Sequence, residues 1–493
     1  MTTTALGHRG GAASARLAAL SSSRLVVVVA LVAGLVRLPL LTRPASPDEG
    51  GLLLVASQWQ PGHSLYGNYW VDRPPLLLDV FVIAHGLGGL VALRLLGVVA
   101  VVASVVLAGV VGRQAHPGRL APLTAAGLAA VLLCQARFGV FEVDGELLGV
   151  PVLLAGFALT LAAARAPSAS AAALRLAGAG GSAAAALLIK QNQADVAILL
   201  AVGLLTFLRT APLRSARALL AVIAGGATVT SLVLAGAAAR GTHLAGLWEA
   251  VVTFRFQASH VIATSASAAT TDRLHHLLFA ALVSGLPLLL IGWLTALPAH
   301  PHRGELDLRW ASAAVLGWEA FAVLGGGSYW SHYLIGLVPG LVLADAVRRT
   351  APVALAVAAV ACVVSLVPML GHPGQAPLPE VTWLRDRVHP GDTAVVAYGH
   401  PNVLQATGLN SPYSELWSLP VRVRDPHLTE LSTLLFSSSR PDWIVTGPDG
   451  DLAGWGISDL SAEVPFRAFY REVAYLGDTR IYLLRSDSRP SSS

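Results

Sequence analysis

The sequence predicts an α-helical polytopic membrane protein, and three observations support that prediction. Of the 493 residues, 54% are hydrophobic and only 12% are charged, whereas about a quarter of the residues in a typical soluble domain are charged. A single soluble core also stops growing beyond roughly 250–300 residues. Apolar runs of about membrane length recur between residues 24 and 370. Together these observations exclude a single water-soluble globule and a disordered chain.

The charge and the cysteines argue against two further kinds of protein. The formal net charge is +5 at pH 7, from 33 basic and 28 acidic residues, and the sequence has no basic cluster of the kind that binds nucleic acid. We therefore expect no nucleic-acid partner. The two cysteines, Cys134 and Cys362, lie inside apolar runs, so neither a disulfide scaffold nor a cysteine-based zinc site is expected.

The apolar runs predict about eleven membrane-spanning helices. A spanning helix needs roughly 20 mostly apolar residues, and several of the runs are shorter than this or merge with a neighbour. The first run lacks a small-residue cleavage site after it, so we treat it as a retained span and not as a signal peptide. The predicted spans are Leu25–Leu41, Arg94–Gly112, Leu120–Gln135, Leu147–Ala164, Leu174–Ile189, Val196–Leu208, Ala218–Ala239, Leu277–Leu297, Trp310–Leu324, Tyr333–Val347 and Pro352–Leu370.

The placement of arginine predicts the orientation in the membrane. Loops on the cytoplasmic side carry an excess of basic residues. If the N-terminus is cytoplasmic, the short cytoplasmic segments hold fourteen arginines, and the longer outer segments hold seven basic residues. With eleven spans the C-terminal segment lies outside. We therefore expect a multi-pass protein of the plasma membrane with a cytoplasmic N-terminus and an extracytoplasmic C-terminus.

The chain divides into three predicted parts. Residues 1–23 form a disordered cytoplasmic tail, residues 24–370 form the transmembrane domain, and residues 371–493 form a small extracytoplasmic α/β domain, because charged and turn residues return there. Short β-rich runs and one helical run fix the expected elements of this last domain. They are Thr393–Tyr398, Trp443–Thr446, Arg480–Leu484 and the helical stretch Thr429–Ser437.

The first outer loop, residues 42–89, is the strongest candidate for a site. It combines acids, aromatic residues and Arg73, as loops that carry function on a rigid scaffold commonly do. Its apolar stretch Leu76–Ala84 is too short to span and predicts an interfacial or re-entrant helix. Of the adjacent acids Asp48 and Glu49, one can act as a base while the other orients a substrate or binds a cation. The alternative is that both favour the start of a helix, where acids stabilise the dipole.

Later outer segments add further polar residues near the membrane. Lys190, the only lysine, ends a span and can meet a phosphate or snorkel to the interface. Glu146 follows two other acids and is also a plausible helix cap. Arg255 lies in Leu244–Val261, for which an amphipathic helix anchored at the membrane interface is favoured over a functional site. His332 and Tyr333 follow three glycines, and the aromatic residues here fit a membrane belt as well. Together these residues predict an outward-facing polar cavity at headgroup level.

The order of these residues resembles a known family. Arg37 ends the first span, the Asp48–Glu49 pair follows, and the run Asp72-Arg73-Pro74-Pro75-Leu76 leads to Arg94 in the next span. Further matches are Glu146, Lys190-Gln191, and His332-Tyr333 with Pro339. The set, over about residues 24–344, resembles the polyprenyl-phosphate-dependent GT-C glycosyltransferases of the protein O-mannosyltransferase and aminoarabinose (lipid A) transferase-like group, of actinobacterial type.

The resemblance implies a fold and a reaction. The fold is the GT-C fold, with about 11 transmembrane helices and a C-terminal α/β domain. The donor is a polyprenyl-phosphate sugar, and the acceptor is a glycan, glycolipid or protein outside the membrane. Asp48 matches the catalytic base of an inverting transfer, with Glu49 beside it. The residues implied in binding the donor phosphate and substrates are Lys190 first, then Arg73, Arg255, His332, Glu146 and Tyr333.

Cofactor use and two rival functions stay open from the sequence. No cofactor is required by the resemblance, although the carboxylates can hold a divalent cation. The first rival is a transporter or flippase of lipid-linked sugars, which would place its polar site at the membrane midplane between similar halves. The second is a non-catalytic scaffold whose outer domain binds cell-wall components.

Overall fold

The protein is described by a computed structural model over residues 22–208, 212–264, 268–294, 308–347, 352–372, 374–447 and 464–486. Almost all of the predicted tail 1–23 lies outside the described residues. So do several arginines on which the predicted orientation rests: Arg9, Arg16, Arg209, Arg303, Arg348 and Arg349.

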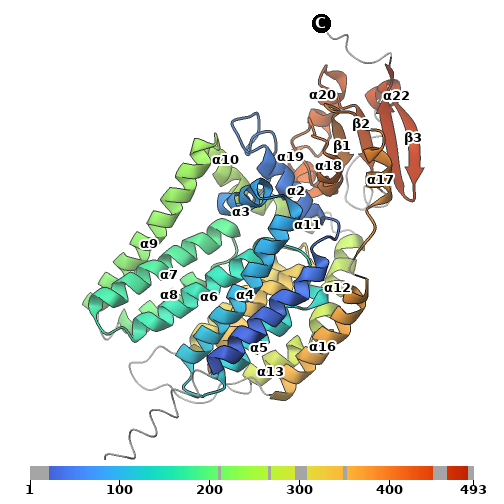
Figure 1. Cartoon of the computed structure of the whole chain (residues 1–493). Coiled ribbons are helices and arrows are strands. Elements are labelled where there is room, and N and C mark those ends of the chain that lie inside the picture. The colour runs from blue at the N-terminus through green and yellow to red at the C-terminus, as the bar shows by residue number, and fades with distance from the viewer. Residues whose placement is uncertain are drawn as a thin grey trace, which may run out of the picture.

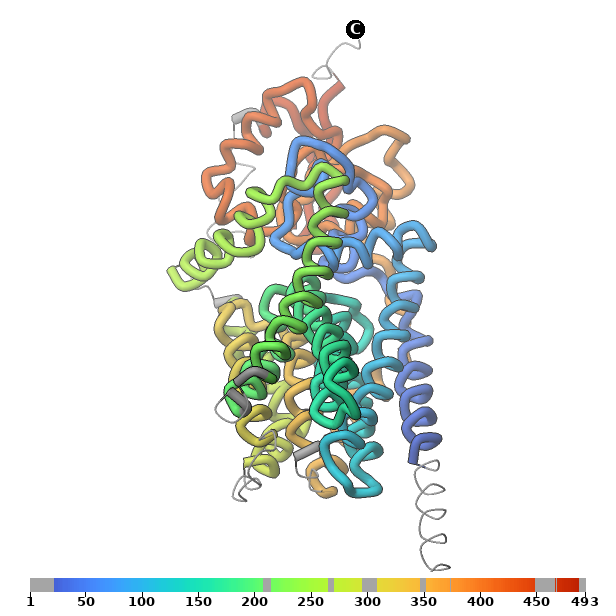
Figure 2. Tube along the Cα trace, turned by 90° about the vertical axis from the view of Figure 1, so that its left-hand side faces the viewer, coloured from blue at the N-terminus to red at the C-terminus, as the bar shows by residue number. Residues whose placement is uncertain are grey.

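The chain forms a bundle of long helices with an α/β region at one end. Figure 1 shows the sheet β1–β4 beyond the end of the bundle at which α2 and α11 lie, and Figure 2 shows the first described helix starting at the opposite end. The first half of the chain, after helix Ser22–Leu40, contains α2 (Pro47–Ser57), α3 (Pro75–Gly86), α4 (Leu90–Ala115), α5 (Ala121–Leu133), η2 (Ala136–Phe138), α6 (Gly145–Ala164), α7 (Ala169–Ile189), α8 (Asp195–Leu208) and α9 (Pro212–Ala239).

The second half of the bundle is more broken, and the C-terminal region follows it. The elements are α10 (Leu244–Trp248), the π-helix η3 (Glu249–Thr253), α11 (Phe254–Thr264), α12 (Ala268–Val283), α13 (Leu286–Leu294), α14 (Leu308–Gly325), the 3₁₀ helix η4 (Ser331–Leu337), α15 (Val338–Val347), α16 (Pro352–Gly371), α17 (Pro379–Arg385), β1 (Ala394–Ala397), α18 (Pro401–Thr407), α19 (Ser418–Arg424), α20 (Thr429–Phe436), β2 (Trp443–Thr446), α22 (Val464–Phe469), β3 (Tyr470–Leu476) and β4 (Thr479–Leu484).

Six described helices are long and apolar enough to cross a membrane. A seventh is added if the bent pair α12 and α13 counts as one span, and four shorter apolar helices accompany them. The predicted count of eleven goes beyond this set and stays a prediction. The predicted span Leu277–Leu297 falls on this bent pair, in which α12 and α13 meet at an angle of 65°, and its last three residues lie outside the described residues. The break falls at Gly285, whose φ of +83° favours glycine.

Small residues allow the long helices to approach closely. Gly180 of α7 and Gly225 of α9 each face the backbone of the other helix, and a side chain at either position would collide with it. Glycine at helix contacts of this kind is typical of helices that pack inside a membrane. Helix α4 packs against α5 and α6, and all three contact α15. Helix α4 also contacts α2 and α3, which belong to segment 42–89.

The C-terminal region docks on the first loop of the bundle. Its four strands lie in the order β1-β2-β4-β3, with β1 and β2 parallel and the other pairs antiparallel. Three strands and helix α20 coincide with predicted elements, and β3 was not predicted. Helix α18 packs on α2. The Trp70 N–H donates to the Ser414 carbonyl at 3.1 Å, and Asn402 Nδ2 donates to the Ala45 carbonyl at 3.1 Å.

Candidate active site

The first turn of α2 separates the two adjacent acids. Ser46 caps this helix, with its hydroxyl accepting from the Glu49 N–H at 3.2 Å and its own N–H donating to Glu49 Oε2 at 3.0 Å. Pro47 at the first position pre-sets the helical backbone. The Glu49 side chain therefore folds back on the helix start, while Asp48 lines a cavity.

Glu49 lies in a buried ion pair and not in the cavity. Its exposed fraction is 0%, and Arg94 reaches it with Nη2 at 2.9 Å and Nε at 3.2 Å. The Val143 N–H also donates to Glu49 Oε1 at 3.2 Å. The remaining guanidinium hydrogens of Arg94 point at backbone carbonyls, those of Leu40, Leu41, Arg43 and Pro44. The predicted catalytic part for Glu49 does not fit this position, because every oxygen is already engaged away from the cavity.

A cavity of about 560 Å³ lies between the helical bundle and the C-terminal region. Five residues that the sequence singled out line this cavity, and residues of the C-terminal region form another wall of it. Lys190 and Glu146, also singled out, do not line it. The predicted residues that line it are Asp48, Arg73, Arg255, His332 and Tyr333, and the wall includes Tyr398, Gly399, His400, Trp417–Pro420 and Arg422.

Asp48 is the acid best placed to meet a substrate in this cavity. Its side chain is 35% exposed. The indole N–H of Trp417 donates to Asp48 Oδ1 at 3.1 Å, and Arg73 Nη2 lies 3.8 Å from Asp48 Oδ2. The carboxylate is thus held in place from two sides and still reaches the cavity, which is what a general base requires.

Two positively charged side chains, Arg73 and Arg255, line the same cavity as Asp48. Arg73 Nη1 lies 2.8 Å from Asp72 Oδ1, and Arg255 forms an ion pair with the other oxygen of Asp72. Asp72 therefore holds both guanidinium groups on one side of the cavity. Burial lowers the pKa of Arg255 from its ordinary value, but the pKa of an arginine starts so high that the group stays charged at neutral pH. This pair can accept a phosphate through several charge-assisted hydrogen bonds.

Lys190 stands behind the cavity wall. It follows the last residue of α7 and forms an ion pair with Glu146 of α6. Its ammonium lies 4.6 Å from the centre of the Tyr333 ring, and Tyr333 faces the cavity. The Tyr333 ring therefore lies between the Lys190 ammonium and the cavity, and Lys190 does not contact the cavity directly.

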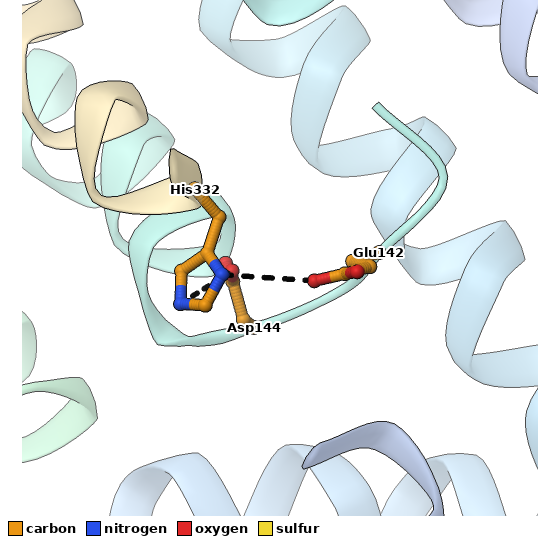
Figure 3. Close-up of side chains that lie close together, drawn as sticks. All are labelled: Glu142, Asp144 and His332. Atoms are coloured by element: carbon orange, nitrogen blue, oxygen red, sulfur yellow. Dashed lines mark ion pairs between the residues drawn. The ribbon is translucent and has the colours of Figure 1, made fainter. Parts of the chain in front are cut away.

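Two acids and a histidine, Glu142, Asp144 and His332, lie together at the edge of the same cavity. Figure 3 shows His332 of η4 pointing at the loop that carries Glu142 and Asp144. His332 Nδ1 is 3.7 Å from Glu142 Oε2, and Nε2 is 3.9 Å from Asp144 Oδ2. Burial, with the negative charges of Asp144 and Glu49, raises the pKa of Glu142 to about 8.

This group has the composition of a divalent-cation site. The ligand atoms of Glu142, Asp144 and His332 lie within 4.8 Å of one another. Asp144 Oδ1 accepts from the Leu147 N–H at 2.9 Å, which caps α6, and within the described residues its buried Oδ2 has no hydrogen-bond partner. Carboxylate oxygens with an imidazole nitrogen suit Zn²⁺ or Mn²⁺.

Several site residues escaped the sequence reasoning. Trp417, Tyr398, His400 and Arg422 come from the C-terminal region, and Trp417 is 369 residues from the acid it contacts. No local motif marks them. Arg37, which lies near the end of the first predicted span, donates from Nη2 to the backbone carbonyl of Glu142 at 2.8 Å.

Comparison with known proteins shows the fold. Neither a family model nor a curated protein sequence matches the chain. Among solved structures, ArnT from Cupriavidus metallidurans bound to undecaprenyl phosphate matches with a TM-score of 0.58 and 14% identity, over 94% of this chain and 98% of that one. The Archaeoglobus fulgidus oligosaccharyltransferase in the apo form matches with a TM-score of 0.55 and 12% identity, over 96% and 75% of the two chains. Its complex with Zn and sulfate gives a TM-score of 0.50 at 14% identity, over 95% and 74%.

Both neighbours are GT-C glycosyltransferases. The chain therefore has the GT-C fold, as the resemblance in the sequence implied. At 12–14% identity this likeness concerns the fold, and function has to be argued from the site.

Proposed function

We propose that the protein is a membrane glycosyltransferase that moves a sugar from a polyprenyl-phosphate donor to an acceptor hydroxyl, with inversion at the anomeric carbon. The observation that carries the proposal is that Asp48, Arg73 and Arg255 line one cavity of about 560 Å³, with Arg73 3.8 Å from Asp48 and both arginines paired to Asp72. An acid that can act as a base therefore shares one cavity with two cations that can bind a phosphate. The undecaprenyl phosphate bound in the similar ArnT structure supports a polyprenyl phosphate as the lipid part of the donor.

The reaction follows from these positions. Asp48 takes the proton of the acceptor hydroxyl, and the hydroxyl oxygen attacks the anomeric carbon from the face opposite the phosphate. The bond between that carbon and the phosphate oxygen breaks, and the lipid phosphate leaves with the electron pair. Negative charge grows on the leaving phosphate, so cations beside it lower the barrier. Glu49 has a structural role, because its contacts with Ser46 fix the start of α2, which carries Asp48.

We place Arg73 and Arg255 ahead of Lys190 as ligands of the donor phosphate. Both arginines line the cavity, and Asp72 fixes their direction. Lys190 acts behind Tyr333 and keeps that ring in place through its contact with the ring face. This order reverses the one expected from the sequence, in which Lys190 came first.

The wall formed by the C-terminal region supplies the acceptor side. Tyr398, His400 and Arg422 offer polar groups across the cavity from the arginines, and glycans, glycolipids and proteins all present hydroxyls that such groups can orient. We further propose that this end of the molecule lies outside the plasma membrane and the N-terminus lies in the cytoplasm. The group Glu142, Asp144 and His332 would hold a divalent cation if the reaction uses one.

A transfer assay in lipid tests the proposed activity. Purified protein is given radiolabelled polyprenyl-phosphate sugars together with a membrane and cell-wall extract, and labelled products are counted. We expect transfer by the wild type and a loss of at least about a hundredfold for Asp48→Asn. Asp79→Asn is the matched control, because Asp79 is also ion-paired to an arginine, Arg240 at 3.3 Å, but does not line the cavity.

The assay also separates the rival function. Equal transfer by the wild type and Asp48→Asn would remove Asp48 as the base. Absence of transfer by the wild type, with labelled lipid crossing the bilayer instead, would establish a flippase. A parallel reaction with a chelator added reports whether a divalent cation takes part.

A further inference from the structure

A second, much smaller cavity lies inside the helical bundle. Its volume is about 30 Å³, and it lies between α6, the start of α8, α14 and η4. A single water needs roughly 10–15 Å³ of such space, so there is room for one ion or one to two waters. Its polar lining consists of Glu146, Asn192, Gln193, Asp195, Glu319 and Tyr333.

Two buried carboxyl groups meet at this cavity. Asp195 and Glu319 are 2% and 3% exposed, and both line the cavity. The Gly340 N–H donates to Glu319 Oε1 at 2.7 Å. In the described part of the chain, Asp195 Oδ1 and Glu319 Oε2 have no hydrogen-bond partner, and no basic side chain forms an ion pair with either group. Two carboxylates that face one small, dry cavity repel each other, so either one of them is protonated or a cation lies between them.

Two amide oxygens in the same lining also lack a donor. Gln193 Nε2 donates to the Gly145 carbonyl at 2.9 Å, which fixes the direction of the amide and leaves Gln193 Oε1 as a buried acceptor. Asn192 Oδ1 is likewise buried, and neither oxygen has a hydrogen-bond partner within the residues described. A proton shared by the two carboxyl groups would leave both amide oxygens without a partner. A cation in the cavity that these four residues line offers a partner to each kind of oxygen.

The helix start does not account for this group. Asp195 is the first residue of α8, where an acid is favourable beside the helix dipole. That explanation does not extend to Glu319, which lies in the middle of α14, or to the amide oxygens. An explanation is therefore needed for the set as a whole.

We propose that this cavity is a calcium site. The donor atoms are all oxygens, which suit hard cations and not Zn²⁺ or Cu²⁺. Two carboxylates match a charge of +2. Ca²⁺ binds carboxylate and amide oxygens directly, whereas Mg²⁺ keeps several of its waters, for which a cavity of about 30 Å³ has too little room. The ion ties α8 and the residues just before it to α14, behind Lys190, and it is independent of the proposed transferase activity.

Terbium luminescence gives a direct test on the full-length protein in detergent or lipid. Tb³⁺ replaces Ca²⁺ at oxygen sites and emits when a nearby tryptophan is excited. Trp318 lines the cavity and donates its indole N–H to the Asn192 carbonyl at 2.7 Å. The measurement is made in a Glu142→Gln background, so that an ion at the group Glu142, Asp144 and His332 does not add to the count. After chelator treatment, we expect one Tb³⁺ per chain in the cavity, sensitised emission, and displacement by Ca²⁺ with a dissociation constant below about 1 mM.

Variants separate this site from the rest of the molecule. Glu319→Gln and Asp195→Asn should each weaken binding at least tenfold, and two variants guard against one that fails to fold. Trp318→Phe should abolish the emission that depends on Asp195 and Glu319, and should leave binding of radioactive Ca²⁺ at this site intact. Asp79→Asn, which alters an ion-paired acid that lines neither cavity, should leave both readouts unchanged.

Three results would overturn the calcium site. One is binding that survives both Glu319→Gln and Asp195→Asn, which would place the ion elsewhere. Another is stabilisation by Na⁺ or Mg²⁺ and not by Ca²⁺. The third is the absence of any bound cation, together with a thermal stability that depends on pH only while both carboxyl groups are present, which would identify a shared proton.

Discussion

The two acids at the start of α2 are neighbours in the chain and lie in opposite surroundings. Asp48 is partly exposed in a wide cavity, with one indole donor and an arginine 3.8 Å away. Glu49 is fully buried, with a two-point ion pair to Arg94 and two backbone donors. Successive residues of a helix point about 100° apart, so adjacent carboxylates reach different regions.

The different surroundings of Glu49 and Asp48 indicate a structural role for the first and a catalytic role for the second. A buried charge with all its partners in place is expensive to disturb, because removing one partner leaves the other without compensation. An acid that keeps access to a cavity can exchange a proton with a bound molecule. We therefore expect changes around Glu49 to affect stability and changes around Asp48 to affect the reaction.

The largest effect is expected from the buried pair. Arg94→Met removes the partner of Glu49 and the donor to four carbonyls, and should lower the free energy of unfolding by about 3–5 kcal/mol. Thermal unfolding in detergent measures it. Arg113→Met is the matched control on the same helix, since Arg113 is exposed and its guanidinium donates to the Ser23 hydroxyl at 3.1 Å. Equal destabilisation by Arg94→Met and Arg113→Met would contradict the special importance of the buried pair of Glu49 and Arg94 for stability.

A smaller effect is expected for donor binding along the cavity. Arg255→Met should raise the KM for the polyprenyl-phosphate donor about tenfold to a hundredfold, because a hydrogen bond to a charged group contributes about 1.5–3 kcal/mol. Lys190→Met should change that KM less and lower the unfolding temperature more, because it leaves Glu146 without its partner. The opposite ranking would restore Lys190 as the first ligand of the phosphate.

The smallest effect is expected from Trp417. Trp417→Phe keeps an aromatic ring and removes the hydrogen bond to Asp48 Oδ1, which is worth about 1 kcal/mol. We expect kcat to fall about fivefold with the donor KM unchanged. Trp383→Phe serves as control, because Trp383 contacts Arg387 and Trp443 away from the cavity. A change in KM alone would assign Trp417 to substrate binding.

The sequence was informative where composition and order decide the outcome. Long apolar runs predicted the helical bundle, and polar residues at their ends, among them Asp48, Arg73, Arg255 and His332, lie on one cavity. The reason is physical, because polar groups at the ends of apolar helices collect at the same level. The family resemblance added the GT-C fold, which hydropathy alone does not specify.

The rest depends on contacts that no local pattern encodes. Glu49 and Asp48 look alike in the sequence, and the contacts of Glu49 with Arg94, Ser46 and the Val143 N–H distinguish them. The bend between α12 and α13 lies inside a run that reads as one apolar span. Trp417 reaches Asp48 across 369 residues, and such a contact is set by how the C-terminal region docks.

The most direct test compares Asp48→Asn with Glu49→Gln in one preparation, by the rate of sugar transfer and the temperature of unfolding. We predict that Asp48→Asn unfolds like the wild type and transfers at least about a hundredfold more slowly. We predict that Glu49→Gln unfolds at a lower temperature and that its folded fraction keeps a rate within about tenfold of the wild type. A Glu49→Gln protein of normal stability without transfer, beside an active Asp48→Asn protein, would contradict the account.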